Sequence, residues 1–390
     1  MEHLIKTIFW FSLGVTAFIY FVYPLIIYII AKTRGCKPKK EDITPFVSLI
    51  IALHNEQDVI GGKIDNLFHL DYPKDKLEII FALDGCTDRT KEIILGHKDA
   101  RIKVLDFKER AGKVATLNKA VPEAQGEILF LSDANTILRN NTLFELVHSF
   151  ADEKVGCVCG KLTYTTADKT SVSKGENLYW KYENFIKKYE SRLGKLLITN
   201  GSIQAVRKEL YPFPDPEVAD DFSIPILILA KGYKVVYEPR AVVFEVATQS
   251  VKEEFNQKVR IVAQGFKAAI KLRKALFRLG PLGLFEFVFH KLLRWCVSFF
   301  LTMTFLSNIL LIDNGFYAVF FFLQAFFYGL AIIGLFLRHK RKIKIFYIPF
   351  YFCLVNFAAM IALYRSLRNQ QTRMWEKALT TRQAAGMVKK

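Results

Sequence analysis

The chain has 390 residues, of which 52% are hydrophobic and 35 are phenylalanine, and its formal net charge is +18. A composition this apolar and aromatic excludes a purely soluble globule, so we expect part of the chain to lie in lipid. The excess of lysine and arginine is explained by basic residues on the cytoplasmic flanks of membrane segments. No recognisable motif supports the alternative, a nucleic-acid partner. The six cysteines show no CxxC spacing, which favours a reducing compartment for the soluble part.

An apolar stretch from Ile8 to Ala31 is about long enough to cross a bilayer at ~1.5 Å per residue. Basic residues at positions 32, 34, 37, 39 and 40 follow at once and predict that this end faces the cytoplasm. The length of the run argues against a cleaved signal peptide. We therefore predict a transmembrane anchor over residues 1–32.

Between Phe46 and about Glu245, short apolar runs alternate with amphipathic, charge-rich stretches, which is the pattern of an α/β domain. The predicted strands are 47–53, 77–83, 102–105, 128–131, 156–164 and 233–238. The predicted helices are 56–68, 87–96, 114–121, 141–150, 175–192 and 221–231. About 200 residues suffice for one core, so we predict a single cytoplasmic domain over residues 33–250.

The remainder of the chain is predicted to be membrane-bound. The pattern of residues 251–290 predicts basic, amphipathic helices at a membrane surface. Three apolar segments follow within 291–366, near Trp295–Ile312, Phe316–Leu337 and Ile345–Tyr364, and a basic tail occupies 367–390. Three crossings would place that tail outside the cell, although its charge predicts a cytoplasmic position. We therefore expect 345–364 to be re-entrant or interfacial; the alternative is that the charge rule fails here.

A carboxylate follows one of the predicted strands. The stretch GEILFLSDAN (126–135) is an apolar run of strand length that ends in Asp133 and Asn135. Ligands bind at the carboxyl ends of strands in open α/β sheets, and both side chains offer oxygen to a hard cation. The alternative for this segment alone is a helix cap or an Asx turn.

Two further strands end in polar residues. The first ends in Ala52-Leu53-His54-Asn55-Glu56 and the second in Asp84-Gly85-Cys86-Thr87-Asp88. A loop with Gly112 and Lys113 precedes a predicted helix, where glycine lets backbone approach a phosphate and lysine supplies the counter-charge. Each feature alone is explained by turns and caps, but three such ends on one sheet edge predict a site.

These motifs resemble the family 2 glycosyltransferases with the GT-A fold, in the membrane-embedded branch of hyaluronan, cellulose, chitin-oligosaccharide and poly-N-acetylglucosamine synthases. The resemblance covers nearly the whole chain, through HNE, DGCTD, AGKVATLN, SDAN, TNGSIQAVRKEL, ADD, QKVRI and MWEK. It implies an α/β GT-A fold with a mixed, Rossmann-like sheet and helices on both faces. The residues that it implies for nucleotide or substrate binding are Ala52, Asn55, Glu56, Asp84, Lys113, Asp133, Asn135, Gly201, Gln257, Arg260 and Trp375.

The resemblance also implies a divalent metal, Mg²⁺ or Mn²⁺, held by Asp133 and Asn135 on the donor diphosphate. Asn135 stands where the family has a second aspartate, which removes one charge from the ligand set. The ADD motif implies that Asp221 is the general base and that Asp220 shapes the site. Without the resemblance, both carboxylates would be read as caps of the helix that follows.

The segment from Gln257 to Ile261 resembles the family's QxxRW motif, with Ile261 in place of tryptophan. An isoleucine offers no flat ring for an acceptor sugar, which argues against processive synthesis. Trp375 is alternatively an interfacial anchor, the commoner position of a tryptophan beside a membrane.

The sequence therefore predicts an inverting glycosyltransferase in a bacterial-type inner membrane, in contact with membrane lipids, that uses a UDP-sugar to extend a polysaccharide or a lipid-linked glycan. One alternative is a non-processive enzyme that adds a single sugar to a lipid or lipid-phosphate acceptor. Another is a catalytically inactive membrane scaffold. The membrane segments carry few charges, which argues against a transporter. The sequence does not identify the sugar, an auxiliary partner or the oligomeric state.

Overall fold

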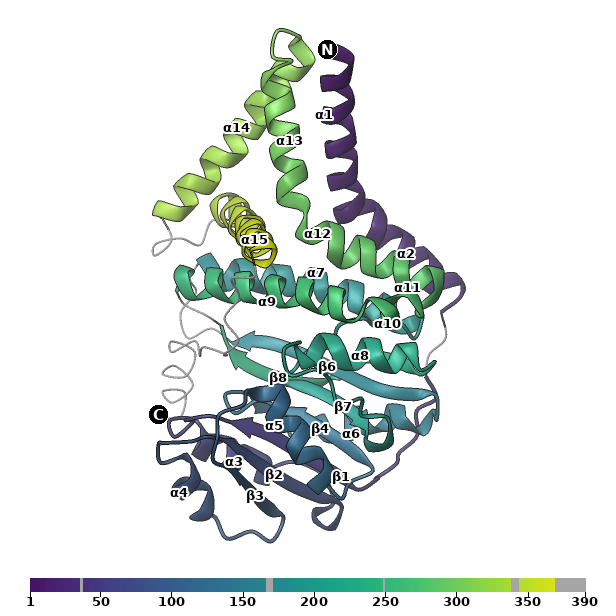
Figure 1. Ribbon diagram of the computed structural model, residues 1–390, viewed down its shortest axis with the longest axis vertical. Helices are drawn as coiled ribbons and strands as arrows, with labels where there is room; N and C mark the ends of the chain where they lie inside the picture. Colours follow the sequence, from purple (N-terminus) through teal and green to yellow (C-terminus); the bar gives the residue numbers. More distant parts are fainter. Residues whose placement is uncertain (36–37, 166–170, 248–249, 338–343, 369–390) are drawn as a thin grey trace.

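A mixed β-sheet organises the part of the chain that is covered by the computed structural model, which describes residues 1–35, 38–165, 171–247, 250–337 and 344–368. Within these ranges eight strands form one sheet, in the order β3-β2-β1-β4-β7-β6-β8-β5 (Figure 1). The strands are β1 Val47–Leu53, β2 Leu77–Asp84, β3 Ile102–Phe107, β4 Ile128–Ser132, β5 Ile137–Leu138, β6 Val155–Thr165, β7 Ile203–Arg207 and β8 Lys234–Val246.

Most of the sheet is parallel. Strand β1 pairs in parallel with β2 and β4, and β2 pairs in parallel with β3. Strand β7 is antiparallel to both β4 and β6, so β4 and β6 run in the same direction. Because parallel strands end at the same edge, β1, β2 and β4 bring their carboxyl ends together, which is where a ligand site is expected.

Both faces of the sheet are buried, as the continuous apolar runs predict. Two apolar clusters cover it, one on each side, and Cys157 and Cys159 of β6 belong to the second. The helices packed around the sheet are α3 Ile60–Phe68, α4 Thr90–Leu95, α5 Lys113–Ala120, α6 Thr142–Val147 and α8 Asp220–Ala230. All six predicted strands and all six predicted helices are present; the strand at 47–53 has the predicted bounds and the others have shifted ends. Strands β5 and β7 were not predicted, because the first has two residues and the second is a five-residue strand that contains the polar residues Gln204 and Arg207.

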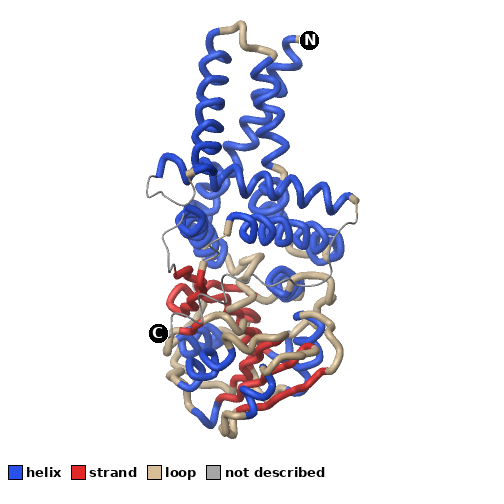
Figure 2. The backbone as a smooth tube through the Cα atoms, turned by 90° about the vertical axis from the view of Figure 1, so that its left-hand side faces the viewer, coloured by secondary structure: helices blue, strands red, loops and turns tan. Residues whose placement is uncertain are grey.

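A layer of helices separates the sheet from the apolar end of the molecule (Figure 1). It contains α7 Ser171–Arg192, α9 Val251–Lys271, α10 Arg273–Phe277 and α11 Gly280–Glu286. Figure 2 shows the same division from the side, with strands confined to one half of the molecule. The amphipathic segment predicted over 251–290 belongs to this layer, so it packs between the sheet domain and the apolar helices.

Among the described residues, three helices are long and apolar enough to cross a membrane, or four if one bent pair counts as a span. The first is a continuous helix from Glu2 to Thr33, built from α1 Glu2–Ala17, a π-helical turn at Phe18–Val22, and α2 Tyr23–Thr33. The others are α14 Gly315–Phe336 and α15 Lys344–Leu367. The bent pair joins the segment 280–295, which includes a second π-helical turn at Phe287–Leu292 and α12 Leu293–Trp295, to α13 Val297–Ile309 at 58°.

Helix α15 differs in direction from the other apolar helices. In Figure 1 it is seen almost end-on beside α9, whereas α1, α13 and α14 are seen from the side. It continues through Pro349 as one helix, so the structure does not support a re-entrant loop within 345–364. The small residues Ala358, Ala359 and Ala362 pack against Val259 and Val262 of α9.

A buried polar contact joins the first apolar helix to the sheet domain. The Tyr23 hydroxyl on α2 donates to Glu190 Oε1 on α7 at 2.6 Å, and His290 Nδ1 lies 2.5 Å from the same oxygen. About two turns earlier on α7, Glu183 pairs with Lys291 and Arg294. Helix α7 is therefore held by charged contacts on the side that faces the apolar helices.

Candidate active site

Three acidic positions meet a lysine at the carboxyl edge of the sheet. Asp84 ends β2, Asp133 follows β4, and Asp220 begins α8. Lys113 begins α5 and lies between two of them: its Nζ is 2.8 Å from Asp133 Oδ1 and 3.3 Å from Asp220 Oδ2. The structure thus brings together residues that the sequence separates by more than one hundred positions.

Lys113 is the centre of this cluster. Its Nζ also donates to the carbonyl oxygen of Gly201 at 3.1 Å. A Cβ at Gly201 would lie 3.1 Å from that Nζ and 3.3 Å from Asp220 Oδ2, so a side chain there would press on the ion pairs. Burial alone would lower the pKa of Lys113, but the Asp133 and Asp220 carboxylates raise it above its usual range. The lysine is therefore a fixed positive charge.

Asp84 shapes the basic loop that precedes Lys113. Its two carboxylate oxygens accept hydrogen bonds from the backbone amides of Ala111, at 2.6 Å, and Gly112, at 2.9 Å. The glycine has φ +92°, a conformation in the region that glycine tolerates. The structure shows this carboxylate in contact with the loop, and its part in nucleotide binding stays a prediction.

Asn55 connects the ends of β1 and β2. Its backbone has φ +53°, and its side chain accepts from the Thr87 amide at 2.8 Å and donates to the Thr87 hydroxyl at 3.1 Å. Beside it, His54 Nδ1 lies 2.6 Å from the Asp84 carbonyl oxygen, and the Glu56 amide donates to Thr90. An asparagine supports a left-handed conformation better than most residues, which explains its presence at this turn. Ala52, which precedes this turn, is half-buried within β1.

A buried lysine supports the turn that carries Asp133 and Asn135. Lys63 on α3 is fully buried, and its Nζ donates to Ser132 Oγ at 3.0 Å and to the Thr136 carbonyl at 2.9 Å. Burial lowers the pKa of Lys63 to about 7, against the opposing effect of the Asp133 carboxylate. Asn135 donates to Glu245 Oε1 at 3.0 Å, so both sides of the turn are anchored.

We expect Lys63→Met to lower activity and stability together. The substitution leaves Ser132 Oγ and the Thr136 carbonyl without their buried donor, which costs about 1–3 kcal/mol of unfolding free energy. The turn that carries Asp133 would also lose its support. Thermal unfolding and initial rates of the purified protein check both effects. Lys76→Met, at an exposed lysine, is the matched control, and equal effects of the two substitutions would contradict the assignment.

Asp221 adjoins this cluster at the start of α8. Burial, followed by the neighbouring charge of Asp220, raises the pKa of Asp221 to about 6, although Lys113 and Lys187 oppose the shift. The backbone carbonyl of Asp221 accepts from the Thr199 amide at 3.0 Å. A carboxyl group that titrates near neutral pH can accept a proton from a substrate and release it to solvent.

The cluster also fits a divalent cation that arrives with a phosphorylated ligand. Asp133 is 28% exposed at its side chain and can face a ligand, whereas Asp220 is buried and its Oδ2 is ion-paired with Lys113. Over the described ranges, no group of three or more His, Cys, Asp or Glu side chains forms a complete protein cage. Magnesium is commonly held by one or two carboxylates, with phosphate oxygens and water completing its shell, and this oxygen-rich set is of that kind.

Other predicted site residues lie on different elements. Gln257 and Arg260 are half-buried on α9, and Ile261 beside them is 47% exposed. Trp375 lies outside the described residues. The sequence analysis did not identify Lys63, Lys187 or Glu245. A signal existed for the first, because Lys63 interrupts the apolar face formed by Ile60, Ile64 and Leu67 on α3.

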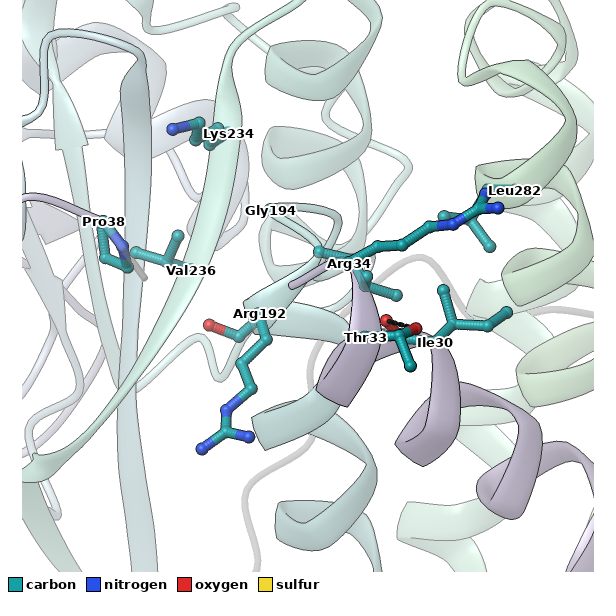
Figure 3. A pocket seen from close by; sticks show the side chains of 11 residues that line it. Ile30, Thr33, Arg34, Pro38, Arg192, Gly194, Lys234, Val236 and Leu282 are labelled. Atoms are coloured by element: carbon teal, nitrogen blue, oxygen red, sulfur yellow. Dashed lines mark hydrogen bonds between the residues drawn. The ribbon is translucent and has the colours of Figure 1, made fainter. Parts of the chain in front are cut away.

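A cavity among the described residues lies elsewhere. It has a volume of about 620 Å³ and lies between the end of α2, the turn after α7 and the beginning of β8 (Figure 3). Lys234 and Val236, which line it, are at the amino-terminal end of β8. The acidic cluster, by contrast, follows the carboxyl ends of β2 and β4, so the cavity belongs to the opposite edge of the sheet.

Residues 48–212 match the sequence profile described as Glycosyl transferase family 2. A β-monoglucosyldiacylglycerol synthase of Nostoc sp. is 30% identical over 185 residues, which are 46% of this chain and 40% of that protein. A poly-β-1,6-N-acetyl-D-glucosamine synthase of Staphylococcus epidermidis is 24% identical over 213 residues, 53% of this chain and 51% of its own. The chain thus spans about half the length, or less, of these curated relatives.

A solved structure resembles the fold over nearly all of the chain. The mannosyltransferase PcManGT of Pyrobaculum calidifontis, solved with GDP-Man and Mn²⁺, superposes with a TM-score of 0.72 at 22% identity. The match covers 94% of this chain and 100% of that one, and at this identity it concerns the fold alone. Together with the profile match, it shows that this chain carries a glycosyltransferase domain of family 2 with the GT-A fold.

Proposed function

We propose that the protein transfers a sugar from a UDP-sugar to a hydroxyl of a glycan or lipid acceptor, with inversion at the sugar carbon. The observation that carries this proposal is the position of Lys113 between Asp133 and Asp220, at the carboxyl edge of the sheet and beside Asp221. This arrangement combines a fixed cation, metal-binding oxygens and a carboxyl group of raised pKa. A donor diphosphate and an acceptor hydroxyl need these three groups.

The donor diphosphate would lie against the start of α5. Lys113 presents positive charge there, and Asp84 holds the preceding loop in place by accepting from the backbone amides of Ala111 and Gly112. Asp133 and Asn135 would hold Mg²⁺ or Mn²⁺, which supplies charge neutralisation for the leaving nucleoside diphosphate. Asp221 would take the proton of the acceptor hydroxyl as the new glycosidic bond forms, and the donor diphosphate leaves with the electron pair of the broken bond.

The acceptor is proposed to be lipid-linked or a short glycan at the membrane surface. The relatives include a β-monoglucosyldiacylglycerol synthase, whose name specifies a lipid product, and a poly-β-1,6-N-acetyl-D-glucosamine synthase, whose name specifies a polymer. Ile261 is exposed on α9 and offers no ring on which a growing chain could stack. This favours addition of one sugar to a lipid over polymer formation, and sizing of the product separates the two.

We also propose a cytoplasmic position for the catalytic domain. The helix Glu2–Thr33 ends among basic residues, on the side of the amphipathic α9 and α10. Helix α15 would lie along the membrane surface rather than across it, since its small residues pack on α9. The basic tail would then remain cytoplasmic.

The proposed function is tested by release of nucleoside diphosphate from a set of nucleotide sugars. Purified protein in lipid nanodiscs should release UDP from one of UDP-glucose, UDP-N-acetylglucosamine, UDP-galactose or UDP-glucuronate when an acceptor lipid is present. Treatment with EDTA should abolish the release, and added Mn²⁺ or Mg²⁺ should restore it. No binding of UDP with either metal would favour the inactive scaffold, and activity with GDP-mannose alone would contradict the UDP assignment.

A further inference from the structure

Lys187 is a buried lysine near the candidate active site. It lies on α7 and is 2% exposed. Its Nζ donates to Asn200 Oδ1 at 2.6 Å and to the Thr199 carbonyl at 3.3 Å. A lysine taken out of water in this way costs free energy unless its hydrogen bonds are made, so its two acceptors define where the 199–201 loop can lie.

The loop held by Lys187 contacts both Asp221 and Lys113 of the candidate site. The Thr199 amide and hydroxyl both donate to the Asp221 carbonyl, at 3.0 and 3.1 Å. Two residues on, the Gly201 carbonyl accepts from Lys113. A displacement of this three-residue loop would therefore move Asp221 and Lys113 relative to each other.

The 199–201 loop is also hydrogen-bonded to the sheet. Asn200 donates from Nδ2 to the Gly160 carbonyl of β6 at 3.0 Å, while its Oδ1 accepts from Lys187. The asparagine thus links α7 to the sheet, and both ends of its amide are used. Its orientation is fixed because the lysine can only donate and the carbonyl can only accept.

We propose that Lys187 is a positioning residue for the transfer reaction, which holds the 199–201 loop through Asn200 and Thr199 and thereby places the Asp221 carboxylate. This inference rests on the proposed function, because it assigns Asp221 as the base. Lys187 does not touch substrate in this scheme. It acts through the loop and through its positive charge.

The charge of Lys187 also acts on Asp221, where its influence opposes the rise of the Asp221 pKa. Four other groups around this carboxyl act on its titration, and they come from different parts of the fold. The charged or titratable groups that face Asp221 are Asp220 of the same helix, Lys113 of α5, Lys187 of α7, Asp133 after β4 and Cys159 of β6. Loss of Lys187 removes one of the two cations in this set.

The experiment compares Lys187→Met with Lys187→Arg and with a matched control, Lys188→Met. Lys188 is the next residue of the same helix and is exposed. For Lys187→Met we expect kcat to fall roughly tenfold, with the KM for the nucleotide sugar within about twofold of the original. The acid limb of the pH profile of kcat should also move to higher pH by roughly half to one unit, because a cation facing Asp221 is gone.

Two further variants separate a positioning role of Lys187 from a purely structural one. Lys187→Arg keeps the positive charge, so the acid limb of its pH profile should stay in place even if its kcat falls. Lys188→Met should match the original protein in both measurements. Asn200→Ala should lower kcat, and its effect should not add to that of Lys187→Met, because the lysine acts through this amide.

Some outcomes would overturn the inference. An unshifted acid limb in Lys187→Met, or full additivity with Asn200→Ala, would show that Lys187 does not act on Asp221. If Lys187→Met fails to fold, Lys187→Gln replaces it as the neutral variant and is compared with Lys187→Arg, which keeps the positive charge. Failure here is distinct from failure of the proposed function, since an active Asp221→Asn variant would refute the base itself.

Discussion

Asp221→Asn should reduce sugar transfer by about 10² to 10⁴, the range that a positioned general base contributes. An asparagine keeps the shape of the side chain but cannot accept the proton of the acceptor hydroxyl. The donor site is built from other residues, so binding of the nucleotide with metal should remain within a fewfold of the original. The measurement is UDP release in nanodiscs, with nucleotide affinity measured by calorimetry on the same sample.

The same carboxyl group predicts the pH dependence of the reaction. Burial and the neighbouring Asp220 raise the pKa of Asp221 to about 6. The base is active when deprotonated, so kcat should rise with pH through about 6 and be lost below it. An acid limb near pH 4 would contradict a raised pKa of Asp221. Asp215→Asn, at a half-exposed carboxylate that pairs with Lys271, should leave both rate and profile unchanged.

Lys113→Met should lower kcat/KM by about 10², since removal of one group that stabilises developing charge costs about that factor. The substitution removes the cation from between Asp133 and Asp220 and leaves two carboxylates facing each other without a counter-charge. Nucleotide affinity should fall. Affinity for Mn²⁺ in the absence of nucleotide should rise, because Asp133 no longer has a lysine partner.

In Lys113→Met the affinity for nucleotide should fall while the affinity for Mn²⁺ rises, and these opposite changes distinguish the prediction from a general loss of structure. A general loss of structure would weaken both, whereas loss of a bridging cation weakens one and strengthens the other. Lys108→Met is the matched control, because Lys108 lies five residues earlier and is 81% exposed at its side chain. Unchanged nucleotide affinity in Lys113→Met would remove the lysine from the donor site.

Much of the fold follows from patterns that the chain carries locally. The run Ile128–Ser132 is buried on both faces, as its continuous apolar sequence indicates, and Asp133 follows it at the sheet edge. The short strand β7, with the sequence IQAVR, was missed because it has neither a long apolar run nor regular alternation, and its partners β4 and β6 are distant in the sequence. Local sequence carries no information about such partners.

The candidate site was less predictable than the fold. Asp133, Asp220 and Lys113 come together as expected, since strand ends and helix starts meet at one edge. Lysines such as Lys63 and Lys187 are usually exposed, so a sequence gives little reason to place them in a core. Their roles depend on acceptors that other elements supply, and only three-dimensional packing reveals those acceptors.

Hydropathy also failed to give the directions of the apolar helices. It located α14 and α15 but did not predict that α15 lies beside α9 or that the chain bends by 58° before α13. Segment length bounds what a helix can span, whereas neighbouring side chains set its tilt. Here those neighbours include Val259 and Val262 of α9.

The contact between Tyr23, Glu190 and His290 constrains how the protein is made. These residues are 167 and 100 positions apart along the chain. At ribosomal rates, His290 is added on the order of ten to fifty seconds after Tyr23. The first apolar helix is therefore synthesised long before its buried hydrogen-bonding partners exist. Attachment of the sheet domain to that helix is consequently a late event of biosynthesis, and the domain has time to complete its own core first.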